Sequence, residues 1–134
     1  MLSVTPIYAG LLVLMLIVLS IRVISLRRRL WVPLGHENNE FLLRRQRIQQ
    51  NFIEYVPLAL ILMLCLELQG ASHWALHGLG IALVTGRLFH AFGLSRIPEN
   101  FTYRTIGMSL TFLVLAISAL YTIYLAVRSA PLAG

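Results

Sequence analysis

Residues 48–68 read IQQNFIEYVPLALILMLCLEL, a mostly apolar run. A helix that crosses a bilayer needs about 20 predominantly apolar residues, and this run has that length. Its apolar character is interrupted by Asn51, Glu54 and Pro57. The stretch therefore predicts a transmembrane helix that carries polar groups inside the membrane.

Three further apolar runs of similar length lie at about residues 7–26, 74–92 and 106–127, and together with 48–68 they make four predicted spans. The chain is 58% hydrophobic, above the usage of about half that is typical of soluble domains. Four spans leave little room for a separate soluble domain. We therefore expect residues 1–134 to form a single all-α integral membrane domain, a bundle of four transmembrane helices.

The charges are distributed unevenly between the two ends of this bundle. The chain has eleven arginines, no lysine and a formal net charge of +6. Six of the arginines lie between the first two runs: Arg27, Arg28, Arg29, Arg44, Arg45 and Arg47. The segment between the third and fourth runs adds Arg96 and Arg104, whereas Arg128 stands at the opposite end. The positive-inside rule then places both loops in the cytoplasm and both termini on the non-cytoplasmic side, and it explains the basic charge without nucleic acid as a partner.

Unusual polar residues converge at the predicted cytoplasmic end. Asn51 and Glu54 lie one to two turns inside the second span, since a helix rises 1.5 Å per residue. Arg87 and His90 lie at a similar depth near the end of the third span, and Arg104 stands just before the fourth. The sequence therefore predicts that three helix ends supply charged groups to one layer.

At the start of the second span, Arg47, Asn51 and Glu54 stand at i, i+4 and i+7, an arc of about 60° on an α-helix. A carboxylate in hydrocarbon is costly unless it pairs with a cation or faces a wet cavity, which makes Glu54 a candidate functional residue. Candidate partners for it are Arg47, Arg87 and Arg104.

Two interpretations of this cluster remain open. In one, Glu54 neutralises Arg87 within a purely structural network. In the other, at least three arginines beside one or two carboxylates leave surplus positive charge that binds an anionic ligand.

Two patterns in the third span indicate a packing role and not a binding site. His73 and His77 have the i, i+4 spacing of metal sites, but no third ligand stands near them in sequence, so we expect no metal there. Gly78, Ala82 and Gly86 form a stripe of small residues at four-residue spacing, which is typical of close helix packing.

The segment 47–57, RIQQNFIEYVP, resembles the second-helix signature of the MAPEG family, the membrane-associated proteins in eicosanoid and glutathione metabolism. The signature is Arg, three residues, Asn, two residues and Glu, at the start of the second of four spans. The stretch from Arg87 through His90 to Arg104 and Thr105 is similar to the family's third-helix end and following loop. The resemblance covers nearly the whole chain and is strongest to small members of the bacterial inner membrane.

This resemblance implies a homotrimer that binds glutathione between neighbouring subunits near the cytoplasmic face. By position, Arg47, Asn51, Glu54 and Tyr55 would hold the tripeptide, and His90 would contact it from the next helix. Arg87 belongs to the same expected glutathione-binding set. The implied catalytic residues are Arg104, which would stabilise the thiolate, and Thr105, which stands where some relatives have serine.

The residue types suit that ligand. Glutathione has two carboxylates and one ammonium, which complement arginines, an amide and one glutamate. A nearby guanidinium favours the nucleophilic thiolate. We therefore expect a glutathione-dependent transferase or peroxidase that acts on lipophilic electrophiles or lipid hydroperoxides at the cytoplasmic leaflet. Two alternatives stay open: a non-catalytic lipid-binding or scaffold protein of the same fold, and a small proton-coupled exporter that uses Glu54.

Overall fold

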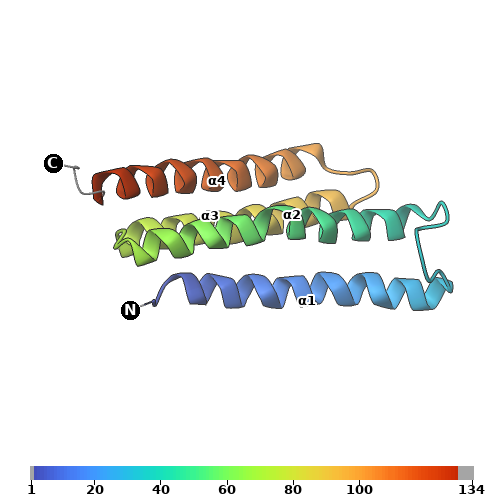
Figure 1. Cartoon of the computed structure of the whole chain (residues 1–134). Helices are drawn as coiled ribbons and strands as arrows, with labels where there is room; N and C mark the ends of the chain where they lie inside the picture. The colour runs from blue at the N-terminus through green and yellow to red at the C-terminus, as the bar shows by residue number, and fades with distance from the viewer. Residues whose placement is uncertain (1, 130–134) are drawn as a thin grey trace.

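The computed structural model describes residues 2–129, which form four α-helices joined by short connections (Figure 1). The helices are α1 (Thr5–Leu30), α2 (Glu40–Leu68), α3 (His73–Ser95) and α4 (Phe101–Ser129). All four are long and apolar enough to cross a membrane. The expected all-helical membrane fold is therefore confirmed.

The helices run up and down, with α2 and α3 between α1 and α4 (Figure 1). α1 packs on α2 and α3, and α4 packs on the other side of the same pair, so within the described chain α1 and α4 do not touch. The start of α1 and the end of α4 lie at the same end of the bundle, while the α1–α2 and α3–α4 connections share the opposite end. We call that opposite end the loop end.

The helices extend further toward the loop end than the apolar runs do. The polar segment between the first two apolar runs is not a loop throughout, because it is helical from Glu40 onward. Arg104, just before the predicted fourth span, lies in the first turn of α4. α2 begins at Glu40 because the side chain of Asn39 caps it, with Oδ1 accepting a 2.9 Å hydrogen bond from the amide of Leu42. Polar helical turns therefore project beyond the apolar spans.

Close packing joins α3 to α4. A Cβ on Gly107 would lie 2.5 Å from the carbonyl oxygen of Gly86, and one on Gly93 would lie 2.6 Å from the amide of Arg104. Backbone therefore meets backbone at both positions. Gly86 fulfils the packing role predicted for the small-residue stripe, but Gly78 does not, since nothing lies within 4 Å of its added Cβ.

A carboxylate holds the start of α1. The Oε1 atom of Glu67, near the end of α2, accepts hydrogen bonds from the amides of Ser3 (2.5 Å) and Val4 (2.8 Å), and Oε2 accepts one from Thr5 (2.7 Å). These amides have no partner within α1, because the first turn of a helix leaves its N–H groups free. Glu67 therefore caps α1 from a different helix.

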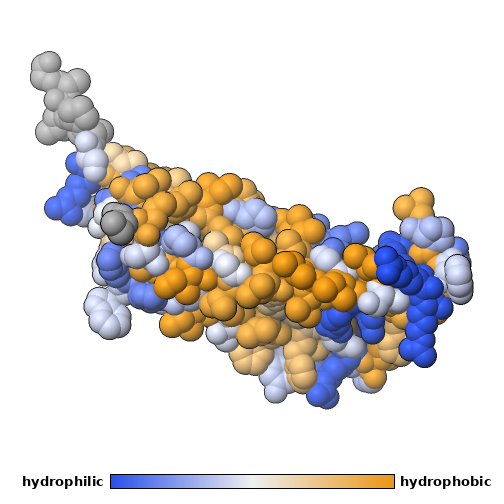
Figure 2. Space-filling view, turned by 90° about the horizontal axis from the view of Figure 1, so that it is seen from below, coloured by the Kyte–Doolittle hydropathy of each residue, from blue (hydrophilic) through white to orange (hydrophobic). Residues whose placement is uncertain are grey.

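The outer surface is dominated by apolar side chains, and hydrophilic ones gather toward the two ends (Figure 2). Exposed leucine, isoleucine and phenylalanine side chains occur along all four helices. In water such a surface would aggregate, whereas lipid chains solvate it. The pattern is that of a bundle surrounded by hydrocarbon.

Candidate functional site

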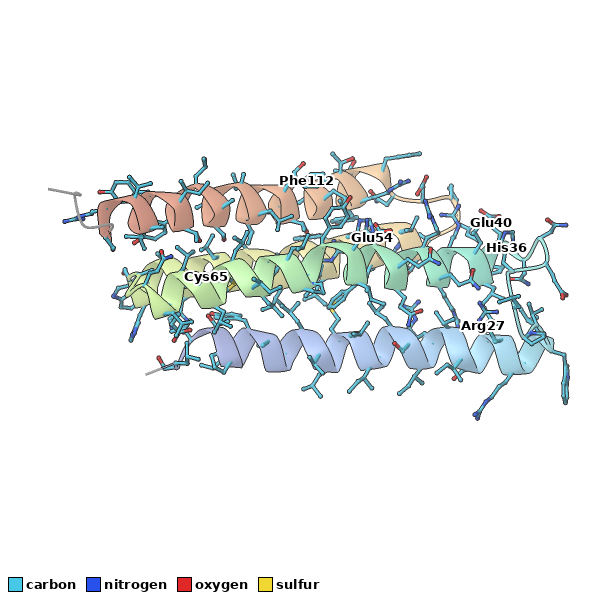
Figure 3. All side chains as sticks on the ribbon, viewed as in Figure 1. Arg27, His36, Glu40, Glu54, Cys65 and Phe112 are labelled. Atoms are coloured by element: carbon cyan, nitrogen blue, oxygen red, sulfur yellow. The ribbon has the colours of Figure 1, made fainter. Side chains whose placement is uncertain are left out.

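A small polar pocket opens near the loop end between α2, α3 and α4. Its volume is about 70 Å³, and it is lined by Arg47, Gln50, Asn51, Glu54, His90, Leu94 and Arg104. Figure 3 shows Glu54 between the ribbons of α2 and α4, toward the loop end. Five of the residues predicted from the sequence therefore share one pocket: Arg47, Asn51, Glu54, His90 and Arg104.

Arg87 lies inside the bundle, next to a residue that lines this pocket. Its side chain is 1% exposed, and Nη2 donates a 2.6 Å hydrogen bond to Oδ1 of Asn51. Nη1 lies 3.4 Å from the hydroxyl of Thr111, and the guanidinium stands 5.7 Å from the ring centre of Phe52. Arg87 thus orients the amide of Asn51, because that oxygen is taken up by the guanidinium and the NH2 group is left free for a ligand.

His90 is 3% exposed in the folded chain, yet it lines the pocket. Neither of its ring nitrogens has a hydrogen-bond partner among residues 2–129. Buried polar groups normally have partners, and each exception calls for an explanation. A ligand in the pocket would supply one.

Glu54 and Arg47 are exposed on the outer face of α2. In the described chain, Glu54 takes part in no ion pair: Arg87 bonds to Asn51, and Arg104 pairs with a different carboxylate. The structural network in which Glu54 neutralises Arg87 is therefore not formed. The Glu54 carboxylate remains open to a partner from outside the chain.

That different carboxylate is Glu99, in the α3–α4 connection. Its Oε2 atom lies 2.9 Å from Nη1 of Arg104 and 3.8 Å from Nη1 of Arg44, which also pairs with Glu40 at 2.6 Å. Glu99 is not among the site residues predicted from the sequence, although it stands only five residues before Arg104. The pairing arises because the connection folds back over the end of α3, with the amide of Asn100 bonded to the carbonyl of Gly93.

Two residues from the resemblance lie outside the pocket. Tyr55 packs edge-on against Phe112 of α4, with ring centres 5.3 Å apart. Thr105 is exposed and lines a separate shallow groove with Ile106 and Ser109 of the same helix. The structure thus does not bring these two side chains to the pocket within one chain.

His77, near the other end of α3, packs against α1. His77 Nδ1 lies 2.9 Å from the hydroxyl of Tyr8, and the two rings meet edge-on. Tyr8 itself covers Gly80, where a Cβ would collide with its ring. His77 thus joins the packing of α1 against α3.

The chain is similar to proteins of one known family. The model of the MAPEG family matches residues 5–124. The chain is 36% identical over 121 residues to the inner membrane protein YecN of Escherichia coli K12, an alignment that covers 90% of this chain and 91% of YecN. YecN of Escherichia coli O6:H1 matches to the same extent, and no solved structure matches the chain.

The family match spans all but the first residues and the end of α4. Together with four helices long enough to span a bilayer and relatives named as inner membrane proteins, it makes this a multi-pass protein of the bacterial inner membrane. The chain belongs to the MAPEG family.

Proposed function

We propose that this protein binds glutathione and acts as a transferase or peroxidase on lipophilic electrophiles or lipid hydroperoxides. One observation carries the proposal: the pocket near the loop end combines two arginines, one oriented amide, and a carboxylate and a histidine that have no partner among residues 2–129. Belonging to the MAPEG family supports it. The loop end then faces the cytoplasm, because most of the arginines stand in the helix ends and connections there.

The charges complement the tripeptide. Arg47 is exposed at the mouth and pairs with no carboxylate in the described chain, so it can bind a glutathione carboxylate. Glu54 can accept hydrogen bonds from the ammonium group. Asn51 can donate from its amide NH2, since Arg87 occupies its oxygen.

One chain provides only part of the site. A cavity of about 70 Å³ is much smaller than the roughly 300–1,000 Å³ of most ligand pockets. Arg47 and Glu54 are also exposed where they line this pocket, so they can contact a group outside their own chain. We therefore propose that a neighbouring copy in a homotrimer closes the pocket and that glutathione lies between the two.

Arg104 is the proposed catalytic residue. Its side chain lines the pocket, and a guanidinium cation stabilises a thiolate by its charge and its N–H donors. The thiol proton leaves to water, and the thiolate attacks the electrophile. A carbon–sulfur bond forms as the leaving group departs with its electron pair. Lipid solvates the outer helix faces, so an apolar electrophile can approach from the membrane.

The test is calorimetric titration of glutathione into the detergent-purified protein and its Arg47→Ala variant. Arg47 is exposed, so its removal should leave the fold intact. The affinity for glutathione should fall at least tenfold, because the variant loses one charge-assisted hydrogen bond of about 1.5–3 kcal/mol. Arg128→Ala is the matched control, because it removes an exposed arginine at the other end. Unchanged binding by Arg47→Ala and by Asn51→Ala would disprove the proposal.

A second measurement separates catalysis from binding. Ultraviolet absorbance of bound thiolate should rise in the wild type and stay low in Arg104→Gln, which keeps its hydrogen-bonding capacity and loses its charge. Glutathione binding without thiolate in the wild type would instead favour the lipid-binding or scaffold alternative. Proton-coupled transport that survives Arg104→Ala and is lost in Glu54→Gln would favour the exporter.

A further inference from the structure

A second group of arginines lies on the other side of α2. Arg22 of α1 is half-buried, and its Nη2 atom lies 3.4 Å from the hydroxyl of Ser95 at the end of α3. Arg45 of α2 is also half-buried, and its Nη1 atom donates a 2.7 Å hydrogen bond to the backbone carbonyl of Arg22. Arg22 thus contacts α3 through its guanidinium and α2 through its backbone carbonyl, and the charges of Arg22 and Arg45 repel each other.

No carboxylate neutralises this group. The ion pairs of residues 2–129 are Arg44–Glu40, Arg44–Glu99 and Arg104–Glu99, and none involves Arg22 or Arg45. A guanidinium has five N–H donors, and each of these two uses one on the described protein. Most of the donors are therefore available to an anion.

The depth of the pair defines the kind of anion. Arg27, labelled in Figure 3, marks the polar end of α1, and Arg22 lies five residues, or about 7–8 Å, further into the bundle. An uncompensated cation at that depth is unfavourable, because hydrocarbon does not solvate charge. A phosphate at the membrane interface, held by lipid chains on the apolar outer surface, would solvate both guanidinium groups.

The group is also separate from the glutathione pocket. Arg45 and Glu54 are nine residues apart on one helix, which at 100° per residue places them on opposite faces of α2. Arg22 reaches toward α3 and Arg45 toward α1, so the group lies where these three helices meet and not on the outer face of α2 that the proposed trimer would cover. This side stays available to lipid.

We propose that Arg22 and Arg45 form a binding site for the phosphate group of an anionic phospholipid at the loop end of the bundle. The two guanidinium groups bind the phosphate oxygens, and the lipid chains lie against the apolar faces of α1 and α3. Ser95 donates its proton to the carbonyl of Ala91 and accepts from Arg22, so it orients that guanidinium. The bound lipid ties α1 to α2, because its phosphate contacts Arg22 and Arg45.

The test measures the melting temperature of the delipidated, detergent-purified protein during titration with phosphatidylglycerol or with phosphatidylcholine. Phosphatidylglycerol should raise the melting temperature of the wild type at lower concentrations than phosphatidylcholine does. In the double variant Arg22→Gln/Arg45→Gln, the half-saturating concentration of phosphatidylglycerol should rise at least tenfold. Arg29→Gln is the matched control, because it removes an exposed arginine from the same end of α1.

The single variant Arg45→Gln covers the case in which the double variant does not fold, since glutamine can still donate to the carbonyl of Arg22. Equal effects of the two lipids on the wild type would overturn the proposal, and so would an equal loss in Arg29→Gln. Inorganic phosphate is the third titrant. If it alone reproduced the stabilisation, the site would bind a free anion and the lipid assignment would be wrong.

Discussion

Arg87 Nη2 donates a 2.6 Å hydrogen bond to Asn51 Oδ1, which joins a buried cation of α3 to a residue that lines the pocket from α2. Asn51 is a predicted ligand residue, and it also accepts the shortest hydrogen bond that Arg87 makes in the described chain. Binding and stability are therefore coupled at this position, and a variant of Asn51 changes both.

Asn51→Ala should lower the free energy of unfolding by about 2–3 kcal/mol, because it leaves the buried Arg87 without its best acceptor. Arg47→Ala, on the same face of α2, should change stability by less than about 0.5 kcal/mol, since it removes an exposed side chain. Unfolding by added denaturing detergent, followed by tryptophan fluorescence, measures both. Equal stability of the two variants would mean that Arg87 finds another acceptor.

Glu99→Gln should tighten glutathione binding about threefold. Glu99 lies 2.9 Å from Arg104, so its negative charge opposes an anionic ligand beside the same arginine. The effect is small because Arg104 is 43% exposed and solvent screens the pair. Calorimetry with Glu40→Gln as control measures it, since Glu40 pairs with Arg44 and not with Arg104. Weaker binding would show that Glu99 instead holds Arg104 in place.

Gly107→Ala should destabilise the protein by about 1–3 kcal/mol, the usual cost of overpacking, because the new Cβ would lie 2.5 Å from backbone atoms of Gly86 and His90. Gly78→Ala should be neutral or stabilising by up to about 1 kcal/mol, since alanine favours helix and nothing lies nearby. Thermal unfolding compares the two. If Gly78→Ala destabilised the protein as much, another copy of the chain would cover that position.

Glu67→Gln should destabilise the start of α1 by about 1–2 kcal/mol, because it removes charge from a carboxylate that caps three backbone amides. Hydrogen exchange of the first turn of α1 should accelerate accordingly. Glu37→Gln, in the α1–α2 connection, is the control and should leave that exchange unchanged. Uniform acceleration across all four helices would mean that α1 does not open independently.

The four helices and one stripe of the candidate site could be predicted from the amino-acid sequence. Apolar length is a local property, so the spans could be identified without knowing how they pack. The helical period alone placed Arg47, Asn51 and Glu54 on one stripe of α2, and in the structure all three line one pocket. The first residue of α2 was predicted less well, because it depends on the cap at Asn39, which lies among polar residues outside the apolar run.

The tertiary structure alone decided which polar groups pair. The partner of Arg87 is Asn51 and not Glu54, and the partner of Arg104 is Glu99, while Tyr55 turns toward Phe112. These outcomes depend on how each helix is rotated about its own axis. That rotation is determined by side-chain packing between helices and by the backbone contact of α3 with α4, neither of which can be read from the period of a single helix.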